Sequence, residues 1–276
     1  MPTNKQLCLL HANCQGEPLA RLLGLSAEFS RRWEVRHYTN YTRESIPDAD
    51  LETCDLFLYQ NLDQKWGDFS SASLLARLNP KARPICVPNL YFLGCWPFLT
   101  NDSVMDFGDS FLDRLIDQGV DKPAILKLYL HSDITRFIDL DAALAETFRI
   151  EEAKETHSAI KTVPLVREHW KRRMLFHTCN HPGKMLMGHL ANGVLAELGI
   201  KPLPDALTDN FVLEYSDFDL PIHPQVAAYH GLDYGRQGHE FNVFNRPMTF
   251  ERYVSRYIER RLQGLEDGFL AFLQLV

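Results

Sequence analysis

Short apolar runs alternate with helical patterns over the first ninety positions of the chain. Each run has the length of a buried strand, and apolar residues three and four positions apart predict the helices between the runs. Because strands that alternate with helices are typical of right-handed βαβ units, we expect a small parallel sheet flanked by helices. The predicted strands are Leu7–Leu10, Trp33–Tyr38, Leu56–Tyr59 and Ile85–Val87, and the predicted helices are Pro18–Leu23, Ala27–Arg32 and Ser71–Leu78, the last with Ser70 or Ser71 as its N-cap.

Strand signals fade from about residue 101 to residue 170, and helical patterns replace them. No Gly/Ser-rich linker marks a domain boundary, and no internal repeat is visible. We therefore interpret residues 101–170 as a large helical insertion within a single α/β domain that comprises residues 1–276. The predicted helices of this insertion are Ser110–Asp117, Ala124–His131 and Leu140–Ile150.

The last third of the chain begins with a further predicted sheet element, Arg173–His177, and a second strand-turn-helix. Pro182 is expected in the first turn of the helix Met185–Leu198, where its missing N–H costs nothing. A Pro-rich, irregular stretch with a short helix at Pro224–Tyr229 follows. The chain closes with a predicted amphipathic helix, Phe250–Leu275, whose apolar face consists of Phe250, Tyr253, Val254, Tyr257, Ile258 and Leu262.

Composition and charge exclude several classes of protein. Hydrophobic residues make up 45% and charged residues 24% of the sequence, as in an ordinary globular protein. A net charge of −7 argues against general nucleic-acid binding, which needs a basic face. No apolar run has the length of a membrane span, and the polar N-terminus predicts no signal peptide. Six cysteines without CxxC spacing and scattered histidines predict no metal site, no disulfide framework and a reducing, cytoplasmic location.

Polar side chains follow three of the predicted strands. Ligands of parallel sheets bind outside the carboxyl ends of the strands, so residues at these ends are expected to share one site. The alternative is ordinary loop chemistry, since Asn is a common turn former. These residues are Asn13, Cys14, Gln15 and Gly16 after the first strand, Gln60 and Asn61 after the third, and Asn89 and Tyr91 after the fourth.

Cys14 lies where a strand passes into a helix. The unpaired N–H groups and the positive dipole end of that helix favour a thiolate or another anion. The amides of Asn13, Gln15 and Gly16 are candidate donors to an oxyanion. The alternative is that Cys14 is a small buried residue, because free cysteine is among the most buried types.

His181 lies in the second strand-turn-helix and is the candidate general base. It precedes a proline, so its alternative role is to cap the helix. His177 and Asn180 lie beside it in sequence and are candidate supporting residues, although His177 at a strand end is also typical of a core histidine.

A basic cluster includes candidates to bind the phosphates of a small molecule. Lys184 lies at a helix start, where the dipole favours anions. The alternative for each of these residues is a solvated helix face or an ordinary surface lysine. The cluster consists of Arg167, Lys171, Arg172 and Arg173, with Lys161 before it and Lys184 after it.

The order of four segments resembles the WcbI family of capsular polysaccharide biosynthesis proteins. The segments are HANCQGEPLARLL at residues 11–23, QN at 60–61, PNLYF at 88–92 and HTCNHPGKMLMGHLA at 177–191. The resemblance covers most of the chain and implies a coenzyme A-binding protein that is proposed to be an acetyltransferase. The turn layout is also similar to SGNH-type esterases and acyltransferases. The chain departs from that type, because Cys14 stands where a serine is expected and no DxxH precedes His181.

We therefore expect an O-acetyltransferase with an SGNH- or flavodoxin-like α/β core. It would transfer an acetyl group from acetyl-CoA to a sugar hydroxyl during bacterial capsular polysaccharide biosynthesis. The alternatives are an SGNH-like esterase or deacylase and a non-catalytic coenzyme A-binding subunit; a homo-oligomer is left open. Cys14 and His181 are the candidate catalytic residues. Coenzyme binding is assigned to Asn13, Gln15, Gly16, Gln60, Asn61, Asn89, Tyr91, Arg167, Lys171, Arg172, His177, Asn180 and Lys184.

Overall fold

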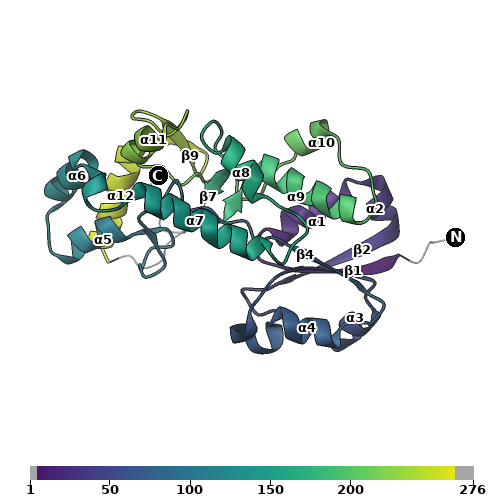
Figure 1. Cartoon of the computed structure of the whole chain (residues 1–276). Helices are drawn as coiled ribbons and strands as arrows, with labels where there is room; N and C mark the ends of the chain where they lie inside the picture. Colours follow the sequence, from purple (N-terminus) through teal and green to yellow (C-terminus); the bar gives the residue numbers. More distant parts are fainter. Residues whose placement is uncertain (1–4, 265–276) are drawn as a thin grey trace. The chain divides into compact units, whose positions relative to one another are not determined.

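The computed structural model describes residues 5–264, which group into two compact units (Figure 1). The first unit comprises residues 5–91, 150–168 and 181–214, and the second comprises 92–149, 169–180 and 215–264. Neither unit is a continuous piece of sequence, because the chain passes repeatedly from one to the other. The single-domain organisation of residues 1–276 stays a prediction.

A four-stranded parallel sheet is the centre of the first unit (Figure 1). Its strands are β1 (Gln6–Ala12), β2 (Trp33–Thr39), β3 (Leu56–Gln60) and β4 (Arg83–Val87), in the order β2-β1-β3-β4. Leu10 aligns with His37 on one side and with Leu58 on the other. The predicted α/β fold with a small parallel sheet is confirmed, and each observed strand extends beyond its predicted bounds by one to three residues.

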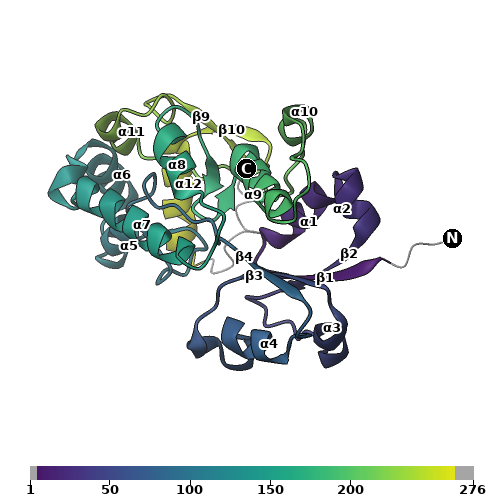
Figure 2. The same cartoon turned by 45° about the vertical axis from the view of Figure 1, so that its right-hand side comes forward.

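Helices cover both faces of this sheet (Figure 2). On one face α1 (Gly16–Gly24) packs against α9 (Lys184–Glu197), with α2 (Ala27–Arg32) following α1. On the other face lie α3 (Asp48–Thr53) and α4 (Ser71–Arg77), preceded by the short 3-10 helix η1 (Gln64–Phe69). The unit also contains α10 (Asp205–Asp209), which contacts α9.

The core on the α3/α4 face shows why the sequence pattern folds in this way. Leu9 of β1 and Phe57 of β3 are fully buried, and Leu51 of α3 and Leu74 of α4 pack onto them. Each buried Leu or Phe contributes roughly 1.5–3 kcal/mol of transfer free energy. Because β1 and β3 run parallel, the residues that follow both strands lie at the same edge of the sheet.

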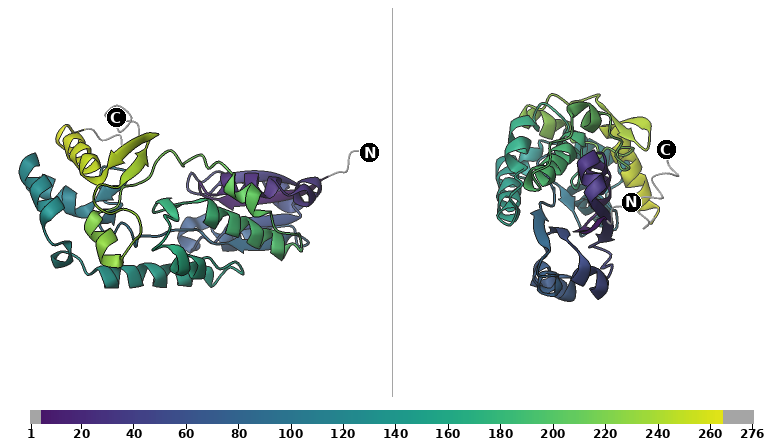
Figure 3. Two further views of the ribbon diagram at one scale, coloured as in Figure 1. Left: turned by 90° about the horizontal axis from the view of Figure 1, so that it is seen from above. Right: turned by 90° about the vertical axis from the view of Figure 1, so that its right-hand side faces the viewer.

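The second unit contains helices, a hairpin and short strands (Figure 3). Helix α12 (Phe250–Leu262) contacts α5 (Ser110–Asp117) and α6 (Lys122–His131). The hairpin β9 (Glu240–Val243) and β10 (Arg246–Thr249) leads directly into α12. The remaining elements are β5 (Leu99–Thr100), β6 (Gly108–Asp109), η2 (Ile134–Arg136), β7 (Phe176–Thr178) and α11 (Pro224–His230).

Two helices contain residues of both units, namely α7 (Leu140–Glu155) and α8 (Val163–His169). The predicted helical content of residues 101–170 is confirmed, and α8 is an additional helix there. No helix of residues 5–264 is long and apolar enough to cross a membrane.

Several predicted details are wrong. Pro182 belongs to the short strand β8 (His181–Pro182), because Gly183 is the N-cap and α9 begins only at Lys184. The predicted strand Arg173–His177 shortens to β7, and β7 is not a strand of the four-stranded sheet of the described chain. Leu262, expected on the apolar face of α12, is 53% exposed because the helix ends there. The rest of the predicted helix Phe250–Leu275 extends beyond the described residues.

Candidate functional site

The candidate site lies in the first unit, at the carboxyl edge of the parallel sheet. The chain leaves β1 for α1 on one face, whereas it leaves β3 for α4 on the other face (Figure 2). Strands β1 and β3 are neighbours, so their ends form the switch point where parallel sheets bind ligands. Cys14 follows β1 at this point, and Gln60 is the last residue of β3.

A tight turn holds Cys14 between β1 and α1. The Gly16 N–H donates to the Asn13 carbonyl at 2.8 Å, and the Gln15 N–H donates to the Asn13 side-chain oxygen at 3.0 Å. Both hydrogen bonds span Cys14, because they join residues on either side of it in the sequence. The backbone N–H groups of Gln15 and Gly16 therefore already have acceptors within the turn.

The Gln60 carboxamide fastens this turn to β3. Its Oε1 accepts from the Asn13 N–H at 2.8 Å and from Asn40 Nδ2 at 3.2 Å. Its Nε2 lies 3.2 Å from Asn13 Oδ1 and 3.4 Å from Gln15 Oε1. Gln60 is only 2% exposed. Both ends of its side chain are thus used inside the protein, so Gln60 positions the turn.

The segment after β4 is fastened to the same turn. Gln15 Nε2 donates to the Leu90 carbonyl at 2.8 Å, and Gln15 Oε1 accepts from the Leu90 N–H at 3.1 Å. Asn13 Nδ2 donates to Asn89 Oδ1 at 3.1 Å. Three strand ends are therefore joined by one set of hydrogen bonds, which we call the carboxamide network: the side chains of Asn13, Gln15, Asn40, Gln60 and Asn89.

Some donors at this edge are not bonded to another residue of the described chain. Within residues 5–264, neither the backbone N–H of Cys14 nor Nδ2 of Asn89 is hydrogen-bonded to another residue. The Cys14 N–H lies against its own thiol. The donors available to a ligand at this edge therefore include one on Cys14 and one on Asn89.

Burial raises the pKa of the Cys14 thiol above its ordinary value. The backbone N–H of Cys14 has the opposite, smaller effect. Within the described chain, the thiol has no hydrogen bond to a histidine. The expectation of a thiolate favoured by the helix is not supported, because removal from water outweighs the neighbouring donor.

His37 and Asn40, at and just after the end of β2, belong to the same edge and were missed in the sequence. His37 packs directly on the turn: a Cβ at position 16 would lie 2.2 Å from His37 Nε2, so only glycine fits there. His37 Nδ1 lies 3.8 Å from the carboxylate of Glu17. The signal that could have found them is position, since polar residues end β2 just as they end β1 and β3.

Tyr91 is connected to a buried carboxylate on α7. The Tyr91 N–H donates to Glu151, which is 7% exposed and accepts from Lys154 Nζ at 2.6 Å. Burial, with a smaller effect of Glu155, raises the pKa of Glu151 to about 7 against the attraction of Lys154. Lys154 Nζ also lies 5.1 Å from the centre of the Tyr91 ring.

The remaining predicted site residues of the first unit are exposed or half-buried, in contrast to the buried Gln15 and Gln60. Asn61 is exposed directly after β3, and His181 is half-buried in β8. Lys184 Nζ donates to the Asp209 carbonyl at 3.1 Å. Arg167 pairs with Glu152 at 2.7 Å on the surface, so both of these predicted phosphate ligands already have partners.

Four predicted site residues belong to the second unit. Lys171 and Arg172 are exposed and follow α8 rather than lying on it. Asn180 Oδ1 accepts from Thr178 Oγ1 at 2.9 Å. His177 Nδ1 lies 2.7 Å from Oδ1 of Asp219, a residue that the sequence pattern did not single out.

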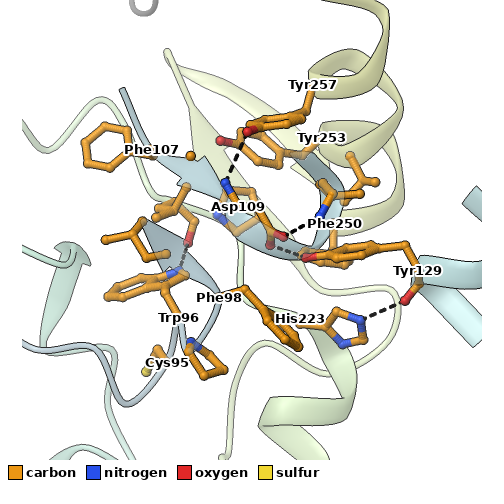
Figure 4. A pocket seen from close by; sticks show the side chains of 17 residues that line it. Cys95, Trp96, Phe98, Phe107, Asp109, Tyr129, His223, Phe250, Tyr253 and Tyr257 are labelled. Atoms are coloured by element: carbon orange, nitrogen blue, oxygen red, sulfur yellow. Dashed lines mark hydrogen bonds between the residues drawn. The ribbon is translucent and has the colours of Figure 1, made fainter. Parts of the chain in front are cut away.

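A small cavity of about 40 Å³ lies among aromatic side chains of the second unit (Figure 4). Asp109 accepts a hydrogen bond from Tyr129, and its own N–H donates to the Tyr257 hydroxyl at 3.1 Å. Burial raises the pKa of Asp109 to about 6. The volume suits one or two water molecules rather than a coenzyme. No group of three or more potential metal ligands gathers anywhere in residues 5–264.

Comparison with known proteins agrees with this fold. The family model described as "Polysaccharide biosynthesis enzyme WcbI" matches residues 7–203, well over half of the chain. No curated protein gives a significant match. One similar solved structure is described as WcbI, a novel polysaccharide biosynthesis enzyme, in its native form without a disulfide bond between coenzyme A and its Cys14. It has a TM-score of 0.76 and 18% identity, over 98% of this chain and 94% of that one. The chain belongs to the WcbI family of polysaccharide biosynthesis enzymes.

Proposed function

We propose that this protein binds coenzyme A at the edge of the sheet and transfers an acetyl group from acetyl-CoA to a sugar hydroxyl. The acceptor would be a precursor of a bacterial capsular polysaccharide, and the reaction would take place in the cytoplasm. Membership of a family of polysaccharide biosynthesis enzymes supports the general role. The acetyl group, the acceptor class and the location come from the resemblance of the sequence motifs.

The observation that supports this proposal most is the environment of Cys14. It lies at the switch point of a parallel sheet, and among the described residues neither its own N–H nor Nδ2 of Asn89 is hydrogen-bonded to another residue. The similar WcbI structure is described with reference to a disulfide between coenzyme A and its Cys14. A coenzyme thiol that reaches the cysteine of this chain would bring its acyl group to the same two donors.

The chemistry of the residues predicted from the sequence assigns them to the two ends of such a coenzyme. Cys14 and Asn89 would face the thioester, whereas Arg167, Lys171, Arg172 and Lys184 are the cations proposed for its phosphates. The pair of Arg167 with Glu152 is exposed, and exposed pairs contribute at most about 1 kcal/mol. Arg167 could therefore exchange this pair for a phosphate at little cost.

Bound acetyl-CoA would supply the acetyl group as a thioester. The N–H of Cys14 and Nδ2 of Asn89 would donate to the thioester oxygen as negative charge develops on it, which is the largest single contribution in many acyl transfers. A histidine would accept the proton of the sugar hydroxyl, and the sequence predicts His181 for this role. Because burial raises the pKa of the Cys14 thiol, we propose that the thiol positions the thioester and does not carry the acetyl group.

A thermal-shift titration with coenzyme A and acetyl-CoA tests the binding step. A ligand that binds only the folded chain raises the melting temperature by mass action, by an amount equivalent to about 2.7 kcal/mol at a hundred times its Kd. Mass spectrometry of sugar acceptors incubated with the protein and acetyl-CoA labelled in the acetyl group then tests the transfer. The absence of a thermal shift with either ligand would contradict the proposal.

A second candidate is a coenzyme A-binding subunit without catalysis. It is favoured by the raised pKa of Cys14 and by the buried members of the carboxamide network, Gln15, Asn40 and Gln60, whose side chains are used inside the protein. Tight binding of coenzyme A with no labelled product would support it. An SGNH-like deacylase remains the third alternative, and release of acetate from acylated sugars without coenzyme would identify it.

A further inference from the structure

The parallel sheet of the first unit has two outer strands, β2 and β4, and the edge of β4 is closed. In a parallel ladder alternate residues bond to the neighbouring strand, and the residues between them turn their N–H and C=O groups outward. The Arg83 N–H of β4 donates to the Asp55 carbonyl at 2.9 Å, so Pro84 and Cys86 face outward. Pro84 has no N–H, and the Cys86 carbonyl accepts from Ser158 Oγ at 2.8 Å. Another strand would therefore find few partners there.

The last residue of β2 shows which groups of this strand face outward. The Asn40 N–H donates to the Ala12 carbonyl at 3.0 Å, which continues the ladder with β1. In contrast, the Thr39 N–H donates to the Glu44 carboxylate at 2.9 Å, and the Thr39 carbonyl accepts from the Glu44 N–H at 3.3 Å. Thr39 therefore faces away from β1, and so does every second residue before it.

These outward residues are Trp33, Val35 and His37, and they leave the edge of β2 open. The Trp33 N–H donates to the Phe29 carbonyl at the end of α2. Within residues 5–264, the outward N–H groups of Val35 and His37 bond to no other residue. A hollow of about 580 Å³ lies beside this edge, and Phe29, Trp33 and Val35 are among the residues that line it. Free backbone groups beside apolar surface are a template for another strand.

Charge selects the register in which this edge can pair with itself. Glu34 and Arg36 of β2 carry opposite charges, and their side chains are 58% and 46% exposed. In an antiparallel pair centred on Val35, Glu34 of each copy lies opposite Arg36 of the other, which stabilises a sheet. A shift by two residues in either direction would place Arg36 against Arg36 or Glu34 against Glu34, which is destabilising. The edge is therefore complementary to itself when Val35 is at the centre.

We propose that β2 is the interface of a homodimer, in which the β2 strands of two copies pair antiparallel and join their sheets. Val35 of each copy donates to and accepts from Val35 of the other, and each His37 N–H donates to the other copy's Trp33 carbonyl. Both free N–H groups of the edge then have acceptors, while the Trp33 N–H keeps its bond to Phe29. Because the same patch pairs on both sides, the assembly closes at two copies.

Sedimentation velocity of the full chain over a series of concentrations tests this pairing. The wild type should change from monomer to dimer as its concentration rises. Val35→Pro removes an outward N–H that the sheet of a single chain does not use, so it should abolish the dimer and leave the monomer folded, as checked by circular dichroism. A wild type that stays monomeric at every concentration, or a dimer that survives Val35→Pro, would overturn the proposal.

An exchange of charges tests the register without a proline. Glu34→Arg or Arg36→Glu alone places like charges opposite each other, so each variant should dimerise about tenfold more weakly than the wild type. A mixture of the two variants restores opposite charges in every pair and should form a mixed dimer. Glu52→Arg, at an exposed position on α3, makes the same change of charge outside the edge and should dimerise like the wild type. If the mixture associates no better than the single variants, the proposed pairing is wrong.

Discussion

The side chain of Gln15 and the backbone of Leu90 are joined by two hydrogen bonds, of 2.8 and 3.1 Å. One carboxamide thus acts as donor to the carbonyl and as acceptor from the N–H of the same residue, although the two residues are 75 positions apart. The consequence is that the residue after Cys14 is fixed by the segment after β4. The shape of the turn that holds Cys14 therefore depends on the sheet and not on local sequence alone.

The buried Gln60 requires an amide and not a carboxylate. In Gln60→Glu the donor that faces Asn13 Oδ1 and Gln15 Oε1 becomes a charged oxygen, which is repelled by both. We expect the free energy of unfolding to fall by about 3 kcal/mol at pH 8, and by less at pH 4, where the carboxyl is protonated and can donate. Urea unfolding at the two pH values measures this, with the exposed Gln64→Glu as control. Equal stability of Gln60→Glu and the wild type at pH 8 would contradict the role of the network.

Gly16 is required by its contact with His37. In Gly16→Ala the new Cβ meets the imidazole at 2.2 Å, so we expect a loss of about 1–3 kcal/mol. Gly24→Ala at the other end of α1 has open space around its Cβ and should gain up to about 1 kcal/mol from helix propensity. In a double-mutant cycle measured by chemical unfolding, His37→Ala should relieve most of the cost of Gly16→Ala. An additive cycle would show that the two residues do not clash.

Glu151 should make the protein less stable as the pH rises. Its pKa is raised from 4.5 to about 7, so the folded chain keeps a proton that the unfolded chain has lost between these values. Stability therefore falls as pH rises through this window, and the penalty is complete above pH 7. Glu151→Gln should reduce the change in unfolding free energy between pH 5 and pH 8, measured by urea titration. Glu28→Gln, on the exposed face of α2, should show the same difference in unfolding free energy between pH 5 and pH 8 as the wild type. If Glu151→Gln also shows the wild-type difference, the raised pKa of Glu151 is not its cause.

His11 reduces stability in acid. It is 1% exposed in β1, and neither ring nitrogen has a hydrogen-bond partner among the described residues. Burial, with a smaller effect of His37, lowers the pKa of His11 from 6.5 to about 4. Above pH 6.5 the imidazole is neutral in both the folded and the unfolded chain, so it causes no loss of stability through protonation. As the pH falls from 6.5 toward 4, only the unfolded chain takes up the proton, and the free energy of unfolding decreases. His11→Leu should raise the unfolding free energy at pH 7 by about 1 kcal/mol and weaken the acid loss. A lower stability of His11→Leu at pH 7, with His131→Leu unchanged, would mean that the imidazole is needed.

Cys14 should react slowly with alkylating reagents at neutral pH. Its raised pKa leaves less thiolate than in a free cysteine, so the rate should increase about tenfold per pH unit up to pH 8 and beyond. The other cysteines of the chain are buried, so Cys14 should be modified first. Mass spectrometry of iodoacetamide-treated protein measures both, and Cys14→Ser should remove the early product. A rate that levels off below pH 7 would instead indicate a stabilised thiolate.

The convergence of the strand ends follows from the sequence. The apolar runs predict β1, β3 and β4, and the rule for parallel sheets predicts that Asn13, Gln60 and Asn89 lie together. Their hydrogen bonds confirm this placement. The same reasoning could not predict how the amides are used, because an amide that binds a ligand and one that binds its neighbours have the same sequence pattern.

Contacts between distant segments without a pattern could not be predicted. Asp219 follows His177 by 42 positions, in a stretch with no helical or strand period. The two turn residues of the hairpin β9–β10, Phe244 and Asn245, both adopt positive φ angles. The usual sequence signal for such a turn is Asn-Gly, which this chain lacks here. The ring centres of Phe244 and Phe218 lie 4.9 Å apart. This packing offsets the strain of the positive φ angle, and the contact is visible only in the tertiary structure.

The bond between Gln15 and Leu90 also fixes an order of events. During synthesis Cys14 leaves the ribosome well before β4 does. Until then the carboxamide of Gln15 lacks its partner, the backbone of Leu90. The turn reaches its final shape only when β3 and β4 have joined the sheet, since their ends supply Gln60 and Leu90. A nascent or truncated chain that stops before β4 therefore carries Cys14 without the hydrogen bonds between Gln15 and Leu90.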